Sequence, residues 1–191
     1  MKTGYRDRQI LFYNYSAGFN RDFFEGLTVV NSPATCLEKA TRHLYELIVI
    51  FQKIRLLNER FALIKLCSTL KKSLSSKHIP LLCILPSKHR GLLEQLQNAG
   101  VEYVRFFNQN DATTKEYMES LLAKPSEDCM VDGILSEICP HINYFPISRH
   151  QEILYCGAYR NRLVLGPHRL EHCCETTNHK NCQYFKCPKL I

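Results

Sequence analysis

The sequence lacks an apolar stretch long enough to cross a membrane, and Met1–Gln9 is mainly polar and charged. A transmembrane helix needs about 20 consecutive, mostly apolar residues, and a secretory signal needs an apolar segment near its start. We therefore expect a cytoplasmic protein with no membrane partner.

Long runs of one charge are also missing, although the formal net charge is +7, from 25 basic and 18 acidic side chains. The basic excess is spread along the chain, and no run of five like charges occurs. This pattern is typical of a solvated surface, and it does not by itself indicate a nucleic-acid partner.

The ten cysteines include no C-x2-C pair, the spacing common in zinc knuckles and in dithiol redox motifs. Seven of them nevertheless lie between Cys129 and Cys187. In a reducing compartment, cysteines at this density favour metal binding over disulfides.

Three unbroken apolar runs, at 47–51, 79–85 and 101–107, organise the N-terminal two thirds of the chain. Runs of this length without polar alternation are typical of strands buried on both faces of a parallel sheet. Shorter runs at 10–15 and 27–30 predict two more strands.

Helical patterns separate these runs. One is expected from Ser32, as N-cap before Pro33, to about His43, with Leu37, Ala40 and Leu44 on one face. Gln52–Glu59 is expected as a loop. Other helices are expected over 16–25, 61–74, about 92–99 with a glycine stop at Gly100, and 113–123. The alternation predicts an α/β fold with a doubly wound, five-stranded parallel sheet over 8–123, followed by a linker over 124–138.

The phrases ELIVIF (46–51), IPLLCIL (79–85) and NAGVEYVRFF (98–107) resemble the third, fourth and fifth strands of the receiver domain of two-component response regulators. The resemblance covers about residues 8–123. It implies a receiver (flavodoxin-like) fold, and it suggests pairing of two chains into a homodimer.

The resemblance also indicates where receiver chemistry would lie, and the required side chains are absent. The acidic pair falls on Asn14 and Tyr15, the phosphoacceptor on Phe51, the hydroxyl residue on Leu85 and the lysine on Phe106. Asp and Glu are absent throughout 10–20 and 47–58. Phosphoryl transfer to an aspartate needs a carboxylate nucleophile and acidic Mg²⁺ ligands. We therefore expect a pseudo-receiver with no Mg²⁺ and no phosphorylation at this site.

Aromatic and aliphatic residues occupy the sheet edge where open α/β folds bind ligands. The favoured interpretation is packing that fills the vacated acidic pocket. The alternative is an apolar ligand pocket or a docking surface.

Residues 139–187 predict a small cysteine-rich β module, with short strands at 153–156 and 162–165. A segment of this size buries too little apolar surface to fold alone, so it needs a cross-link that stabilises it. We expect a bound metal to supply that cross-link. The candidate ligands are Cys139, Cys156, Cys173 or Cys174, and Cys182, with His179 as a nitrogen alternative. Cys129 and Cys187 are expected to be spare.

The metal is expected to be a [4Fe–4S] cluster or zinc, because isolated thiolates from distant turns suit a cluster as well as zinc. The ending Cys174-x4-His179-x2-Cys182 also resembles a cysteine-rich C-terminal module of various bacterial regulatory proteins.

Together these features favour a non-enzymatic signalling protein that acts through contacts with a protein partner. Two alternatives stay open. A transcription regulator could use the seven basic side chains of residues 139–191, which oppose three acidic ones, but no helix-turn-helix pattern is evident. A thiol or Fe–S redox enzyme ranks last, because no constellation with catalytic spacing occurs.

Overall fold

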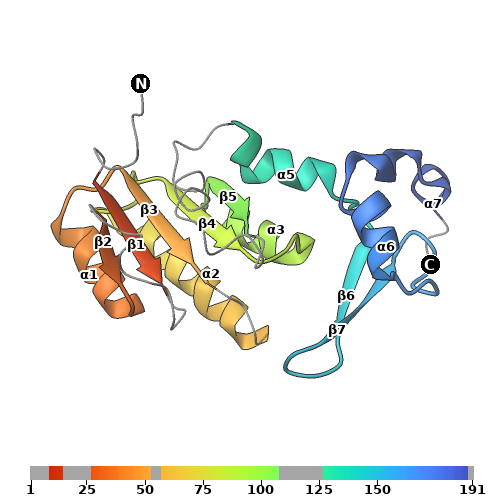
Figure 1. The fold of residues 1–191 in the computed structure, drawn as a ribbon, viewed down its shortest axis with the longest axis horizontal. Coiled ribbons are helices and arrows are strands. Elements are labelled where there is room, and N and C mark those ends of the chain that lie inside the picture. Colours follow the sequence, from red (N-terminus) through yellow and green to blue (C-terminus); the bar gives the residue numbers. More distant parts are fainter. Residues whose placement is uncertain (1–8, 15–26, 53–56, 108–126, 189–191) are drawn as a thin grey trace.

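The expected strands form one parallel sheet in the computed structural model, which describes residues 9–14, 27–52, 57–107 and 127–188. The strands are β1 (Ile10–Asn14), β2 (Thr28–Val30), β3 (Leu47–Phe51), β4 (Leu81–Leu85) and β5 (Tyr103–Phe106). Their order is β2-β1-β3-β4-β5, and every neighbouring pair is parallel (Figure 1). This is the order of flavodoxin-like sheets, so the predicted α/β fold with five parallel strands is confirmed.

Three helices pack on one face of this sheet: α1 (Pro33–Arg42), α2 (Leu57–Lys72) and α3 (Arg90–Asn98). The Ser32 side chain caps α1 by accepting the N–H of Thr35 at 3.1 Å. Gly100, at a φ of 87°, ends α3 as the glycine stop predicted. The expected helices at 16–25 and 113–123, which the doubly wound arrangement requires, lie outside the described residues.

Both faces of the strands are buried, as the unbroken apolar runs predicted. In β1, Leu11 and Tyr13 join the core beneath the three helices, whereas Ile10 and Phe12 join a second core on the opposite face. All four side chains are at most 2% exposed.

Two details of the helices differ from the sequence prediction. Leu44 is 78% exposed because α1 ends at Arg42, and the buried residues of α1 are Cys36 and Ala40. Helix α2 begins at Leu57, so the predicted loop over 52–59 was too long.

Residues 127–137, within the expected linker, carry a 3₁₀ turn η3 (Glu127–Cys129) and the helix α5 (Val131–Glu137). Val131, Ile134 and Leu135 are buried in the same core as the sheet helices. The side chain of Gln97 on α3 donates to Asp132 on α5. Helix α5 therefore joins the C-terminal segment, residues 139–187, to α3 (Figure 1).

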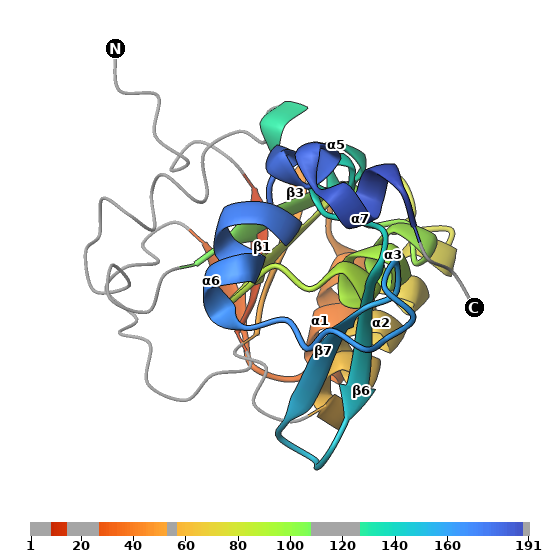
Figure 2. The same ribbon diagram turned by 90° about the vertical axis from the view of Figure 1, so that its right-hand side faces the viewer.

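The C-terminal segment begins with an antiparallel pair, β6 (Ile142–Pro146) and β7 (Glu152–Cys156). Strand β6 was not predicted, and the predicted strand over 162–165 is reduced to a bridge between Val164 and Tyr155. Short helices follow, above the hairpin in Figure 2. They are α6 (Pro167–Arg169), the π-helical turn η4 (Leu170–Cys174), the 3₁₀ turn η5 (Thr177–Asn181) and α7 (Gln183–Lys186).

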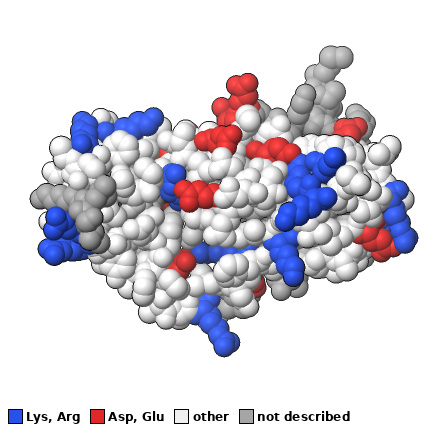
Figure 3. All heavy atoms as spheres, turned by 180° about the vertical axis from the view of Figure 1, so that it is seen from behind, with Lys and Arg blue, Asp and Glu red and all other residues white. Residues whose placement is uncertain are grey.

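None of the helices in the described ranges has the length and apolar character that a membrane span requires. On the face shown in Figure 3, basic and acidic side chains are interspersed. This mixture is typical of a solvated surface.

Candidate functional site

The sheet register brings together the positions onto which the receiver resemblance places a phosphorylation site. Asn14 pairs with Phe51, and Leu85 pairs with Phe106, so these four residues end neighbouring strands. Asn14, Phe51 and Leu85 are buried, and Phe106 is partly buried. Tyr15 lies outside the described residues.

Aromatic rings occupy this edge. The Phe51 ring stacks on Phe12 with a centroid distance of 6.4 Å and meets the edge of Phe107 at 5.0 Å. Phe51 and Phe107 are 1% and 2% exposed. In the described strand ends, no carboxylate is present to accept a phosphoryl group or hold Mg²⁺.

The second candidate site is a group of five cysteines in the C-terminal segment, here called the cysteine cluster: Cys139, Cys156, Cys173, Cys174 and Cys182. They come from four places: the end of α5, the end of β7, the turn η4, and the N-cap of α7. Cys139, Cys156 and Cys174 are buried, whereas Cys173 and Cys182 are partly exposed.

Backbone and side-chain contacts draw this cluster together. The N–H of Cys139 donates to the carbonyl of Cys174 at 2.7 Å. The side chain of Cys173 interacts with that of Cys182. Nη2 of Arg169 lies 3.6 Å from the Cys182 sulfur. Residues 43 positions apart in the sequence thus share one small region.

Neighbouring thiols of the cluster shift the pKa values of Cys139 and Cys174. Burial and then the neighbouring thiols Cys173 and Cys139 raise the pKa of Cys174 to about 12. Burial, and after it a coulombic contribution from Cys156, also raises the pKa of Cys139. Without a cation, Cys139 and Cys174 therefore stay protonated at neutral pH.

Cys182 behaves differently. Burial alone would raise its pKa, but the backbone N–H groups of Phe185 and Tyr184 and the guanidinium of Arg169 together lower it. Cys182 therefore ionises more readily than Cys139, Cys173 and Cys174, and the thiolate is the form that binds metals.

His179, the predicted nitrogen ligand, is 3% exposed and uses its ring differently. Its Nδ1 donates to the carbonyls of Thr176 at 2.7 Å and Glu137 at 3.1 Å. A carbonyl partner at Nδ1 leaves Nε2 as the nitrogen that could face a metal.

The five thiols are gathered but do not converge on one point. Within the described ranges, no three His, Cys, Asp or Glu side chains are arranged as a metal site. The predicted spare residues lie apart: Cys187 is exposed, and the Cys129 sulfur accepts a hydrogen bond from Nε of Arg105 at 3.1 Å.

Sequence reasoning missed a third feature, a polar triad of Arg60, His89 and Glu152. It lies where the parallel sheet with its helices, here called the sheet part, meets the β6–β7 hairpin. Nη1 of Arg60 on α2 donates to Oε2 of Glu152 on β7 at 2.7 Å. Nε2 of His89, which precedes α3, lies 3.1 Å from the same oxygen. The three residues are 29 to 92 positions apart, so no short sequence motif predicts that they come together.

His89 has two further roles. Its Nδ1 accepts the N–H of Leu92 at 3.0 Å and so caps α3, and its ring stacks on Tyr144 at a centroid distance of 3.7 Å. Because Nδ1 accepts, the neutral ring carries its proton on Nε2 and donates it to Glu152. Burial, and next the charge of Arg60, lower the pKa of His89 despite the opposing effect of Glu152.

The depressed pKa of His89 predicts a stability loss in acid. The unfolded histidine takes up a proton near its usual pKa of about 6.5, while the folded ring resists it, so stability is kept above that pH and falls below it. His89→Asn keeps a capping side chain and removes the titration. We expect the thermal midpoint of the wild-type protein to drop more between pH 8 and pH 5 than that of this variant. Parallel pH profiles for the two proteins would contradict the assignment.

No protein-family model matches the chain, and no curated protein matches it.

Proposed function

We propose that this chain is a non-enzymatic regulatory protein, in which a receiver-like α/β unit without phosphorylation chemistry is coupled to a metal module held by the cysteine cluster. The observation that carries the proposal is the gathering of five thiols from four separate places into one small region. The sheet part acts through contacts with a protein partner or with a second copy of the chain.

A thiophilic metal suits the donor set. Cys139, Cys156 and Cys174 are buried and interact electrostatically, and Cys173 and Cys182 are partly exposed. Bringing several buried thiolates together is unfavourable unless a cation compensates their charge. Zinc and Fe–S clusters both take thiolate ligands and supply that charge.

The ligands would be Cys139, Cys156, Cys173 or Cys174, and Cys182, with His179 as the nitrogen alternative. Zinc would cross-link the four places from which these residues come, whereas a [4Fe–4S] cluster would add one-electron chemistry. The hairpin and short helices of residues 139–187 offer little core of their own, so a cross-link there would contribute much of their stability.

The sheet part supports a role in contacts rather than in catalysis. The edge where receivers are phosphorylated is closed by Phe51 and Phe107. Helix α5 ties the C-terminal segment to α3, and Nη1 of Arg90 on α3 donates to the carbonyls of Leu135 and Ile138. A change in the metal module would therefore reach the α3 side of the sheet through a direct connection.

The test is elemental analysis and a UV–visible spectrum of protein purified without oxygen. Iron with sulfide and broad visible absorbance would support a redox-responsive Fe–S module. One zinc per chain and no colour would support a structural staple. Protein that contains no metal, and takes up neither zinc nor iron with sulfide after reduction, would contradict the proposal.

A further inference from the structure

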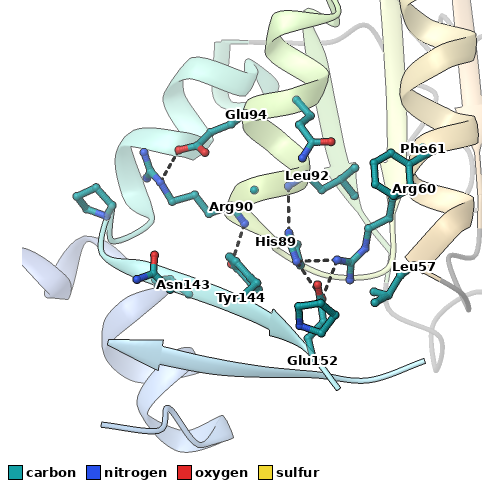
Figure 4. Close-up of a pocket in the computed structure, with 15 residues that line it drawn as sticks. Leu57, Arg60, Phe61, His89, Arg90, Leu92, Glu94, Asn143, Tyr144 and Glu152 are labelled. Atoms are coloured by element: carbon teal, nitrogen blue, oxygen red, sulfur yellow. Dashed lines mark hydrogen bonds and ion pairs between the residues drawn. The ribbon is translucent and has the colours of Figure 1, made fainter. Parts of the chain in front are cut away.

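A pocket of about 460 Å³ lies at the junction of the sheet part and the hairpin. Figure 4 shows it between the first turns of α2 and α3 on one side and β6 and β7 on the other. Its volume is within the range of about 300 to 1,000 Å³ common to small-molecule sites.

The charges that line this pocket are matched. Arg60 is paired with Glu152 at 2.7 Å, and Arg90 with Glu94 at 2.8 Å. His89, with its lowered pKa, adds no charge at neutral pH. A charged ligand would therefore meet no uncompensated opposite charge among these side chains, which disfavours charged ligands.

Hydrogen-bond donors remain open at the same place. Within the described part of the chain, only Nη1 of the Arg60 guanidinium is hydrogen-bonded, to Oε2 of Glu152, so Nε and Nη2 are left to bind an acceptor. Arg60 is also the cation of the triad, and donation from a charged group strengthens a hydrogen bond to a carbonyl oxygen.

The remaining walls combine apolar and aromatic side chains with two polar ones, Gln95 and Asn143. They include Leu57, Leu92, Ile142 and Tyr144, and Phe61 lies at the rim with 70% of its surface exposed. Gly91 lines the pocket without a side chain, and its backbone lies beside the stacked rings of His89 and Tyr144. A flat ring would cover apolar surface here that water now contacts.

We propose that this pocket binds an uncharged small molecule with an aromatic body and a carbonyl-type acceptor that faces Arg60. The proposal goes beyond the regulatory function above and does not depend on the metal. Because the pocket walls come from both the sheet part and the hairpin, a bound molecule would strengthen the contact between them.

The experiment uses benzamide as the probe and the full chain, with binding followed by saturation-transfer NMR and by a ¹⁵N-shift titration. We expect millimolar affinity, as is usual for a fragment of this size, with shifts at Gly91, Leu92 and Tyr144. Benzoate and benzylamine, which share the ring but carry a charge, are expected to bind at least about fivefold more weakly.

Two variants locate the site. Gly91→Leu places a Cβ at ordinary contact distance, 3.4 Å from Cε1 of His89 and 3.9 Å from Cδ2 of Tyr144, and its longer side chain fills the pocket. It should abolish benzamide binding. Phe61→Ser removes an exposed ring from the rim and should weaken binding by about threefold or more. Leu74→Ser, which alters another exposed apolar residue away from the pocket, should leave affinity unchanged.

Three results would overturn the proposal. The first is the absence of saturation transfer from benzamide to the wild-type protein. The second is equal binding to a folded Gly91→Leu variant, and the third is stronger binding of benzoate or benzylamine than of benzamide. None of these results bears on whether the cysteine cluster holds metal, so the two proposals fail separately.

Discussion

Replacing Cys139 and Cys174 together by serine is expected to abolish metal binding and to unfold residues 139–187 while the sheet stays folded. Both residues are buried members of the cysteine cluster, and they are joined by a backbone hydrogen bond of 2.7 Å. Structural zinc contributes about 10–16 kcal/mol in small zinc modules, far more than a hairpin and four short helices gain from burial. Metal content and the rate of trypsin cleavage at Arg149, Arg160 and Arg162 measure the effect.

The matched control for this double variant is Cys187→Ser. Cys187 is exposed and lies outside the cluster, so this variant should retain its metal and its protease resistance. An unchanged metal content in the double variant would contradict the ligand assignment. A metal-free C-terminal segment that resists trypsin as well as the wild-type segment would contradict the role of the metal as a staple.

Phe51→Asp, which places an acid where the receiver resemblance puts the phosphoacceptor, is expected to lower the free energy of unfolding by about 4 kcal/mol or more. The Phe51 ring is 1% exposed and contacts Phe12 and Phe107, so the substitution removes packing and buries a carboxylate without a cation. Urea denaturation gives the magnitude. The variant should also stay unmodified by acetyl phosphate and Mg²⁺ on a Phos-tag gel, because Asn14 supplies no carboxylate for Mg²⁺ and Phe106 supplies no lysine.

Two comparison variants accompany this test. Phe51→Leu keeps an apolar side chain and should lose roughly 1–2 kcal/mol, which keeps the effect measurable if Phe51→Asp does not fold. Phe145→Asp alters a residue that is 64% exposed and should change stability by less than about 0.5 kcal/mol. A Phe51→Asp variant as stable as Phe145→Asp, or one that accepts phosphate, would contradict the packing interpretation.

The sequence was most informative where burial alone decides the structure. Apolar runs such as 47–51 have few conformations that bury both faces, and a parallel strand is one of them. Ser32 before Pro33, and Gly100, act through local backbone geometry, so they marked the start of α1 and the end of α3 correctly. Leu44 was misassigned because periodicity does not show where a helix stops.

Features that depend on contacts between distant residues could not be predicted. Strand β6 ends in Pro146 and exposes Asn143 and Phe145, so its sequence carries no clear strand pattern. The density of cysteines marked the cluster, but the interaction between Cys173 and Cys182 depends on the turns that separate them. The pocket at Arg60 and Glu152 required the fold itself, because its walls come from separate elements.

The contacts that close the junction also bear on how the chain folds as it is synthesised. Arg60 meets Glu152 across 92 positions, and Nζ of Lys88 donates to the carbonyl of Glu175 across 87. The strands β1 to β5 are complete by residue 106, well before either partner leaves the ribosome. Domains fold in the order of synthesis, and long-range contacts form last. A nascent chain stalled before Glu152 would therefore present Arg60 and His89 without their carboxylate.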